Sequence, residues 1–424
     1  MDLSASGSMP PCVFDLEARV AGHTAFAKLN RLLFVAERSE EHRAEAVELA
    51  LRHVRMCTIN TELYKKIFAD YTSYIDVHTF DGAWVKSTDI KAAETLRRIE
   101  GDLRKGQMNS ETENVRLSFN ELGEFHFERG QLKKSLQAYL KSTDYSLKPA
   151  HTIAMCINII RSSISMVSFS DSDVLLYAEK ARMKMISDNK ADPILLAKLE
   201  CSAGLARMKQ GEYRDAARYF SLVPFELESN FSEVIAPSDV GLYGTLCALA
   251  TYNRDELYTL KSKNQPFKNF LELVPVVREL LSDFYCSRYD KCIDYLKLLR
   301  PELELDIHVS HCLDELYKMI VENAMLQYCI PFSSIRLSKM ATTFRMDIEG
   351  LEKEVCKLIT AGKLMARIDS FNKQIFATQT LQRNSTLEGV LKVGNTFNDN
   401  ATAVLLHTQM RKHGVVLRDT SKRL

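Results

Sequence analysis

A short repeated pattern constrains the fold of this chain most. Residues 122–139 read Leu-Gly-x-x-His-x-x-x-Gly-x-Leu-x-x-Ser-x-x-x-Tyr, which is the spacing of a tetratricopeptide-type helical hairpin. In such a hairpin, Gly123 lets two helices approach closely, Gly130 turns the chain between them, and Tyr139 packs back into the groove. The pattern therefore predicts a pair of antiparallel helices, each of which buries one face on its neighbours.

The pattern recurs along the chain. A second copy begins 81 residues after the first and consists of Gly204, Gly211, Tyr213, Ala216 and Phe220. A third phrase, Ser287–Leu296, follows 76 residues later. These distances are close to twice ~40 residues, so one further hairpin is expected between each pair, and residues 157–182 fit the first gap. The copies are degenerate, and they predict an irregular, curved solenoid rather than a peptide-holding groove.

Composition agrees with a mainly α-helical chain. Glycine and proline together make about 6% of the 424 residues, about half the usual share, which leaves little room for a turn-rich β fold. The formal net charge is +1, so no chain-wide positive field attracts nucleic acid or an anionic membrane. The first residues do not look like a secretion signal, and no long apolar run is present. We expect a soluble, intracellular protein with reduced thiols.

The sequence contains none of the common catalytic or metal-binding motifs. There is no Gly-x-Gly, no Gly-x-Ser-x-Gly and no His-Glu-x-x-His, and the ten histidines never form the His-x-His pair of a metal-dependent isopeptidase. His308, His311 and Cys312 form the densest metal-like group, which we interpret as a polar helix face with one buried thiol. Gly241 and Gly244 lie in an apolar stretch and indicate close helix packing. No enzyme, cofactor or metal is predicted.

The chain is predicted to have five parts. They are a flexible N-terminus at 1–25; a helical region at 26–108 that includes a long helix over 88–107; the helical repeats at 109–320; a winged helix at 321–380; and a C-terminal helix with a basic tail at 384–424.

The winged helix is predicted from capping and turn residues. A helix over 322–330 stops before Pro331, because the residue before a proline disfavours the α conformation. The next predicted elements are a helix from Ser333 or Ser334 to 343, a helix over 348–360 ended by Gly362, and strands at 364–369 and 374–377. Two helices followed by a β-hairpin are typical of a winged helix.

DNA binding is the obvious function for a winged helix, and the charge of its second helix argues against it. Residues 347–360 hold four acidic residues and two lysines. A helix that reads the major groove needs positive charge, because it has to replace the cations that surround the phosphates. A nucleic-acid module would have to use Arg336, Lys339 or Arg345. We therefore expect the exposed edge of the wing to pair with another protein, through Ala366, Ile368, Ile375 and Ala377.

The C-terminal helix carries an apolar seam. From Asn384 on, apolar and small residues alternate at spacings of three and four, and the side chains expected to make contacts are Leu387, Val390, Leu391, Phe397, Val404 and Leu405. Two interpretations stay open: the helix folds back on its own domain, or it joins a bundle of helices from other chains. Residues 411–424 form a basic tail.

A helical solenoid followed by a winged helix and a terminal helix resembles the PCI family. Members of that family are scaffold subunits of the proteasome lid, the COP9 signalosome and translation initiation factor three. The phrases at 234–240, 243–250 and 373–377 carry the resemblance. The Tyr-Gly-x-Leu-Cys-Ala-Leu-Ala phrase at 243–250 is more similar to the signalosome branch than to its proteasome-lid relatives.

The resemblance implies a non-catalytic scaffold subunit of the signalosome, which removes the ubiquitin-like protein NEDD8 from cullins. It implies that the zinc-dependent isopeptidase site lies on a different subunit. The implied partners are other PCI and MPN subunits and cullin-RING ligase components, with no membrane and no nucleic acid, and the implied location is the nucleus and cytoplasm. The alternative is the equivalent scaffold subunit of the 26S proteasome lid.

Overall fold

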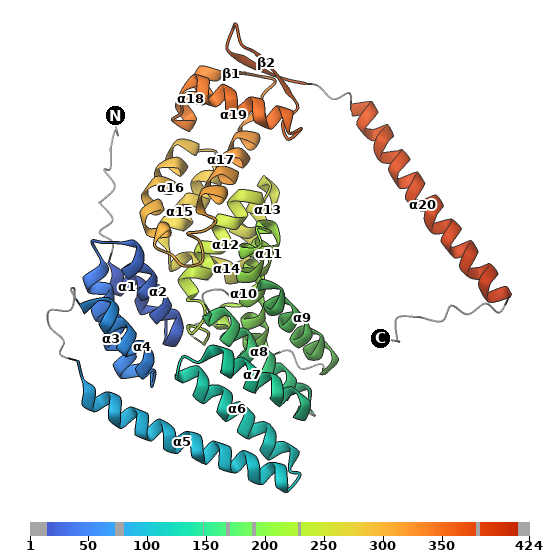
Figure 1. Cartoon of the computed structure of the whole chain (residues 1–424). Helices are drawn as coiled ribbons and strands as arrows, with labels where there is room; N and C mark the ends of the chain where they lie inside the picture. The colour runs from blue at the N-terminus through green and yellow to red at the C-terminus, as the bar shows by residue number, and fades with distance from the viewer. Residues whose placement is uncertain are drawn as a thin grey trace. The chain divides into compact units, whose positions relative to one another are not determined.

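The computed structural model of the chain is mainly α-helical, with one small sheet (Figure 1). It describes residues 15–72, 80–146, 148–166, 170–188, 192–227, 230–378 and 382–413. The chain divides into two compact units. The first holds the residues up to 331 together with 342–346, and the second holds 332–341 and the residues from 347 on.

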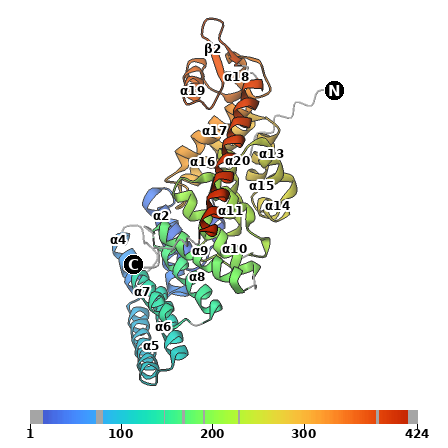
Figure 2. The ribbon, with the colours of Figure 1, turned by 90° about the vertical axis from the view of Figure 1, so that its right-hand side faces the viewer.

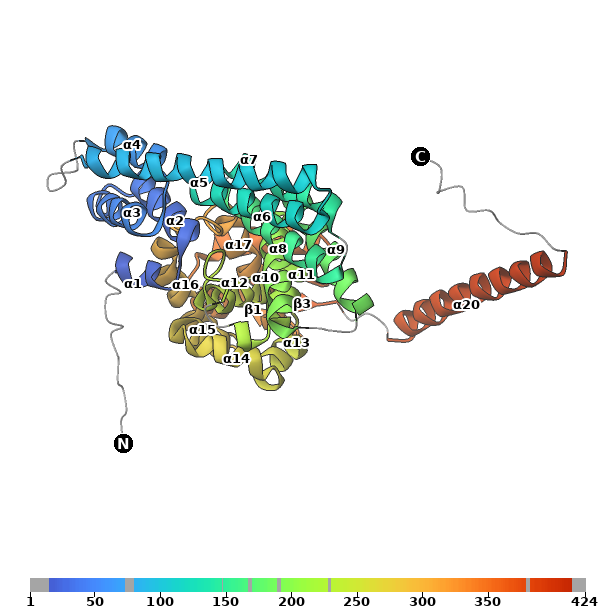
Figure 3. The ribbon, with the colours of Figure 1, turned by 90° about the horizontal axis from the view of Figure 1, so that it is seen from below.

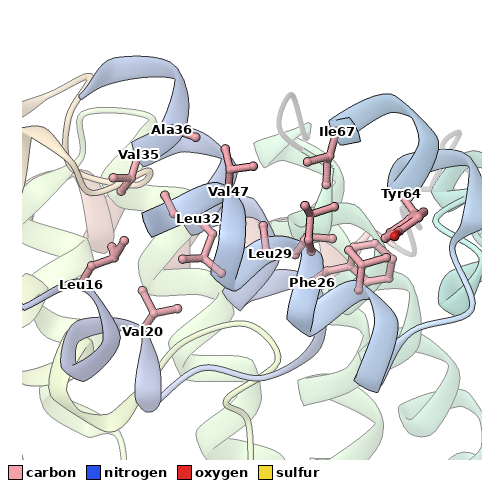
Figure 4. Packing of buried hydrophobic residues seen from close by; sticks show 14 of the residues in the cluster. Leu16, Val20, Phe26, Leu29, Leu32, Val35, Ala36, Val47, Tyr64 and Ile67 are labelled. Carbon is pink, nitrogen blue, oxygen red and sulfur yellow. The ribbon is translucent and has the colours of Figure 1, made fainter. Parts of the chain in front are cut away.

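The first unit begins with four short helices: α1 (Leu16–Ala21), α2 (Ala25–Arg38), α3 (Arg43–Cys57) and α4 (Thr61–Asp70). Their apolar side chains gather into one core between the helices (Figure 4). Because Leu16 and Val20 are buried in this core, residues 16–21 are an ordered helix, which corrects the flexible N-terminus predicted for 1–25. The part of that prediction at 1–14 lies outside the described residues.

A long helix, α5 (Gly82–Met108), follows. It starts where the Asp81 carboxylate accepts a hydrogen bond from the backbone N–H of Trp84, so it begins six residues before the predicted 88. Trp84, the single tryptophan of the chain, packs on Tyr64 of α4 with ring centroids 5.1 Å apart. α5 runs alongside the next helix (Figure 2 and Figure 3), and much of its remaining surface is exposed, as expected for a charged helix.

The predicted hairpins are present. Consecutive helices pack on one another in the series α6 (Thr112–Glu128), α7 (Leu132–Ser142), α8 (Pro149–Ser165), α9 (Asp171–Asp188), α10 (Pro193–Lys209), α11 (Tyr213–Leu222) and α12 (Pro237–Thr251). The hairpin α8–α9 fills the first gap between recognisable repeats. The unit continues with α13 (Arg254–Tyr258), a π turn at Thr259–Lys263, α14 (Gln265–Glu272), α15 (Pro275–Tyr285), α16 (Tyr289–Glu304) and α17 (Leu313–Cys329). Short 3-10 turns lie at Thr143–Tyr145 and Phe225–Leu227.

Glycines set how closely these helices approach. A Cβ atom added to Gly123 would stand 2.5 Å from the ring of Tyr139, and one added to Gly204 would stand 2.8 Å from the ring of Phe220. Both aromatic side chains are fully buried. A Cβ on Gly241 would likewise meet the carbonyl oxygen of Phe270 at 2.9 Å. The close packing predicted for these glycines is confirmed.

The turns of three hairpins share one backbone conformation. Gly130, Gly211 and Ser287 have φ angles of +75°, +80° and +60°. In each turn, the amide of this residue donates to the carbonyl three residues earlier, and the next amide donates to the carbonyl five residues earlier. This is the left-handed helix cap that glycine adopts without strain, and the third hairpin makes it with a serine.

The second unit contains the winged helix. Its elements are β1 (Ser334–Arg336), α18 (Leu337–Phe344, whose last residues belong to the first unit), α19 (Ile348–Thr360), β2 (Ala366–Asp369) and β3 (Gln374–Ala377). The strands form an antiparallel sheet in the order β1-β3-β2. Gly362 has a φ of +69°, which confirms the cap predicted after α19.

One predicted element of the wing is wrong. Residues 334–336 form strand β1 and not the first turn of a helix, because they pair with β3 and place Ile335 opposite Ile375. The inward face was predicted correctly. Ile335, Leu337, Met340, Ala341 and Phe344 are all at most 8% exposed.

The last element is α20 (Gln382–Lys412). It begins two residues before the predicted Asn384 and ends in the predicted basic segment, whose residues 414–424 lie outside the described part. No helix among the described residues has both the length and the apolar character to span a membrane.

Candidate interaction surfaces and a buried charge network

The sheet order decides which wing residues can offer a free strand edge. β3 lies between β1 and β2, so both of its sides are already paired. Ile375 and Ala377 belong to β3, and their assignment to an exposed edge is corrected. Ala366 and Ile368 belong to β2, which pairs with a neighbour on one side only. A protein contact through this strand edge stays a prediction for these two residues. β1 is the edge strand on the other side.

The hydrogen-bond register shows which backbone groups of β2 point outward. The N–H of Thr378 donates to the carbonyl of Met365 at 2.9 Å, and hydrogen-bonded pairs alternate along an antiparallel ladder. Arg367 therefore directs its N–H and C=O towards β3, while Ala366 and Ile368 direct theirs away from it. The Ala366 N–H is taken locally by the carbonyl of Leu364 at 3.2 Å. The outward groups of β2 are thus the Ala366 carbonyl and both backbone groups of Ile368.

The side chains of the predicted wing residues serve different purposes. Ile375 is 2% and Ala366 8% exposed, so they hold the wing together, whereas Ala377 is exposed. Sequence reasoning missed three exposed apolar side chains in or beside the β2–β3 hairpin, which are Met365 (61%), Phe371 (93%) and Phe376 (43%). The alternation of side chains along β3 could have indicated Phe376, because Ile375 beside it faces the core.

Polar contacts fix the tip of the wing that carries Phe371. Asp369 accepts hydrogen bonds from the backbone N–H groups of Phe371 (3.0 Å) and Asn372 (3.1 Å). The bonds from Asn372 lower the pKa of the Asp369 carboxyl. The Glu352 carboxylate on α19 bonds Lys373 at 2.7 Å, which raises the pKa of the lysine. These contacts hold the hairpin against α19.

The acidic residues of α19 are partly neutralised within the wing. Glu352 pairs with Lys373, and Glu354 pairs with Lys357 at 2.6 Å. No ion pair with a described residue is found for Asp347 or Glu349. The helix in the recognition position therefore presents uncompensated negative charge at its start, which disfavours phosphate.

The apolar seam of α20 is exposed along its whole length. The predicted residues are between 57% and 74% exposed; they are Leu387, Val390, Leu391, Phe397, Val404 and Leu405. With Gly394 and Ala401, they occupy one face at helical spacing. Leu406, which is 59% exposed, lies off that face. A seam of this kind offers an apolar surface to another helix.

A buried charge network lies in the first unit, and sequence reasoning missed it. We name it the Arg31–Asp239 network; it consists of Arg19, His23, Arg31, Asp239, Tyr243, Asp306 and His308. The Nη2 atom of Arg31 donates hydrogen bonds to Asp239 Oδ2 at 2.6 Å and to the Tyr243 hydroxyl at 3.1 Å. The Tyr243 hydroxyl donates to Asp306 at 2.8 Å. The network joins α1 and α2 to α12 and to the turn after α16.

The charges of this network stabilise one another. Burial alone would raise the pKa of Asp239, but His23, Arg31 and Arg19 hold it well below its usual range. Asp306 likewise has a lowered pKa beside Arg31 and Arg19 despite its burial. Burial and the nearby Arg31 lower the pKa of His308 to about 3. Two arginines thus face two carboxylates while His308 stays neutral.

The metal-like group of the sequence, which is His308, His311 and Cys312, lies directly before α17. His308 and His311 lie in turns before α17 rather than on the helix face that we predicted. Cys312 is buried, as expected, and burial raises the pKa of its thiol to about 12. No group of three or more His, Cys, Asp or Glu side chains among the described residues is arranged to hold a metal ion.

Comparison with known proteins agrees with this architecture. The family described as "26S proteasome subunit RPN7" matches residues 81–260, and the PCI domain matches residues 288–379. COP9 signalosome complex subunit 1 of Arabidopsis thaliana is 38% identical over 412 residues, which cover 96% of this chain and 92% of the relative. The chain belongs to the COP9 signalosome subunit 1 family.

Two further relatives of this family support the assignment. Subunit 1b of Drosophila melanogaster is 35% identical, and the match covers 82% of this chain and 66% of the relative. Subunit 1 of Emericella nidulans is 29% identical, with 96% and 83% covered. The PCI match begins within the α15–α16 turn and includes the whole wing. The resemblance to the PCI family is confirmed.

Proposed function

We propose that this chain is a non-catalytic scaffold subunit of a COP9 signalosome. The observation that carries the proposal is the similarity to the Arabidopsis subunit over 96% of the chain. The alternative is the equivalent scaffold subunit of the proteasome lid. The RPN7 match favours it less, because it spans residues 81–260 and leaves out the wing and α20.

Assembly through two surfaces is the proposed mechanism. The outward backbone groups of Ile368 on β2 would extend a neighbouring sheet, because main-chain hydrogen bonds can add a strand to an edge. The exposed seam of α20 would join helices of other subunits. Both surfaces lie in the second unit, and the helical repeats of the first unit would supply contacts to further partners.

In the proposed complex, the chain supports removal of NEDD8 from cullin-RING ligases. The zinc-dependent isopeptidase site is assigned to another subunit, and the partners are other PCI and MPN subunits and cullin-RING components. The proposed location is the nucleus and the cytoplasm. Imaging of the tagged chain in its own cells tests that location.

Affinity purification of the tagged chain, followed by mass spectrometry, tests the proposed function. Signalosome subunits and cullins are the expected partners, whereas recovery of proteasome ATPase subunits would support the lid alternative. In parallel, a neddylated cullin is incubated with the purified chain, with the complete complex, and with a complex that lacks the chain. Cleavage by the complete complex and none by the chain alone is expected. Cleavage by the isolated chain would contradict a scaffold role.

A further inference from the structure

Helix α9 contacts both α8 and α10 and leaves one apolar face uncovered. On this face, Leu176, Met183 and Ile186 are 63%, 62% and 68% exposed. Their spacings of seven and three residues place them in one stripe along the helix. Glu179 lies in the same stripe, between Leu176 and Met183, and is exposed as well. Single exposed apolar side chains are common, whereas a row of them along one helix is typical of a contact surface.

A cavity of about 310 Å³ lies beside this stripe, between α9, α10 and Tyr219 on α11. Its volume is at the lower end of the range for ligand-binding sites, ~300–1,000 Å³, so one long side chain can enter it. Glu179 of the stripe also lines the cavity, together with Arg182 of α9 and Glu200 and Arg207 of α10. The apolar part of the wall consists of Leu175, Ala178, Leu199 and Ala203.

Glu200 is the buried acidic group of this cavity, with 3% of its surface exposed. Its Oε1 atom pairs with Arg182 at 3.2 Å, while its buried Oε2 atom has no hydrogen-bond partner among the described residues. Buried polar atoms normally have a partner, so Oε2 lacks a donor. Burial raises the pKa of the Glu200 carboxyl, Arg182 and Arg218 oppose the rise, and the Glu179 carboxylate adds to it. A positively charged donor in the cavity would therefore stabilise both carboxylates.

The other arginines around the cavity have acidic partners of their own. Arg207 pairs with Glu212, and Arg218 on α11 pairs with Asp215 at 3.6 Å. The Nε atom of Arg207 has no hydrogen-bond partner among the described residues, but its ion pair means that it adds no uncompensated charge. Glu179, by contrast, makes no ion pair with a described residue. The arginines are thus matched by carboxylates, and the Glu179 carboxylate is left over.

Lys180, which follows Glu179 in the sequence, faces away from the cavity. Its ammonium lies 5.9 Å from the centre of the Tyr177 ring. Burial raises the pKa of the Cys156 thiol on α8 to about 11, and the charge of Lys180 opposes that rise. Lys180 therefore lies on the α8 side of α9, and Lys184, four residues later, lies on the same side. The stripe and the cavity together offer an apolar surface with one net negative charge.

We propose that this face of α9 is the docking site for a helix of another protein that carries a lysine or arginine within its apolar face. The apolar side chains of that helix contact Leu176, Met183 and Ile186. Its basic side chain enters the cavity, pairs with Glu179 and donates a hydrogen bond to Glu200 Oε2. The last torsion of a glutamate side chain is broad, so a small rotation turns Oε2 towards the donor. The inference does not rest on assembly through β2 or α20, which belong to the second unit.

Photocrosslinking in cells identifies the partner helix. The tagged full-length chain carries Met183→p-benzoylphenylalanine, and the control carries the same substitution at Lys105, whose side chain is 78% exposed on α5. Position 183, and not position 105, is expected to crosslink to a segment of another protein that has a lysine or arginine between apolar residues at helical spacing. No crosslink from position 183 would overturn the proposal. So would a crosslink to a segment without a basic residue, to a second copy of this chain, or to another part of the same chain.

A synthetic peptide of the crosslinked segment then tests the charge contact on the purified full-length chain by titration calorimetry. Glu179→Lys should weaken binding at least ~10-fold, because it brings two like charges together. The matched control Glu94→Lys, on the exposed surface of α5, should bind as the unchanged chain does. Glu200→Gln keeps the shape of the side chain, removes its charge and should also weaken binding. Circular dichroism verifies the fold of each variant.

Exchanging the two charges gives the decisive comparison. A peptide whose basic residue is replaced by glutamate should bind Glu179→Lys more tightly than it binds the unchanged chain. The exposed position of Glu179 keeps this comparison possible even if Glu200→Gln fails to fold. If Glu179→Lys binds the original peptide as tightly as the unchanged chain does, or if the exchanged peptide gains nothing from it, the basic side chain does not enter this cavity and the proposal is wrong.

Discussion

At the scale of single residues, Asp239 and Asp306 are the most constrained side chains of the first unit. Both are at most 4% exposed, and each forms an ion pair with an arginine of α1 or α2. Removing one partner of a buried ion pair leaves an uncompensated charge and costs about 3–5 kcal/mol. The network therefore fixes where the N-terminal helices pack on the repeats, because moving them away would leave these charges buried and unpaired.

The lowered pKa of His308 makes stability depend on pH. The group has a pKa of about 3 in the folded chain and about 6.5 when unfolded. Between these values the unfolded chain holds the extra proton, so the free energy of unfolding should fall as pH decreases, by up to ~1.4 kcal/mol per pH unit for one proton. The lowered pKa of His23 acts in the same direction. Urea titrations between about pH 7 and pH 4 measure the slope.

His308→Gln is expected to make this slope shallower. His407→Gln, on the exposed surface of α20, should leave it unchanged. The lowered pKa values of Asp239 and Asp306 add a further loss of stability once the pH falls below about 4, where these groups protonate in the unfolded chain. A slope that is the same in His308→Gln and in the unchanged chain would contradict the account of His308.

Two hairpin glycines separate backbone strain from steric contact. Gly130 and Gly211 have nearly the same φ angle, but a Cβ on Gly130 would stand 2.0 Å from the side chain of Asn60, while one on Gly211 meets nothing within 4 Å. Gly211→Ala should cost about 1 kcal/mol, the usual penalty of this conformation. Gly130→Ala should cost clearly more, which thermal unfolding can measure. Equal costs would show that Asn60 moves aside freely.

At the scale of elements, the wing contains a three-stranded sheet, and its central strand is the last of the three in the sequence. β3 pairs with β1 on one side and with β2 on the other, so the three-stranded sheet is complete only when both ladders have formed. The Glu352–Lys373 pair ties the hairpin tip to α19. The sheet then has two edges of different kinds. β1 has three residues, while β2 carries exposed apolar neighbours such as Met365.

Proline substitutions in β2 distinguish the outer edge from the inner ladder. Ile368→Pro removes an N–H that points away from β3, so thermal unfolding should stay nearly unchanged while co-purification with other subunits is lost. Arg367→Pro removes an N–H that bonds β3 and should lower the unfolding temperature of the wing. If Ile368→Pro co-purifies as the unchanged chain does, β2 is not an assembly edge.

At the scale of the whole molecule, substitutions in α20 decide between its two interpretations. Phe397→Asp combined with Val404→Asp should prevent association with other subunits, since burying carboxylates in a helix bundle costs several kcal/mol. The unfolding temperature of the isolated chain should not change, because both side chains are more than 60% exposed. Leu406→Asp, off the seam, is the control. A lower unfolding temperature with association intact would show that α20 folds back on its own chain.

Local patterns predicted most of the fold, and distant contacts set the rest. The turns at Gly130 and Gly211 were predictable, because the left-handed cap depends on a few neighbouring residues only. β1 was missed because three residues are too short for a period, and Ser333 and Ser334 also suit a helix cap. The place of Ile375 in a central strand depends on β1, which lies about 40 residues away in the sequence.

The Arg31–Asp239 network could not be predicted for the same reason. Arg31 and Asp239 are 208 residues apart, and no periodic signal joins them. Each looks like an ordinary surface charge in the sequence, since Arg and Asp are rarely buried unless paired. The seam of α20 was predictable as a pattern, whereas its exposure depends on what lies around it.

The position of Trp84 provides a fluorescence probe for one part of the protein. It is the single tryptophan and packs on Tyr64 between α4 and α5, far along the sequence from the wing. Its emission spectrum therefore reports the N-terminal helices alone, while circular dichroism follows all helices at once. Comparing the two signals during heating would reveal whether the amino-terminal helices melt together with the repeats or ahead of them.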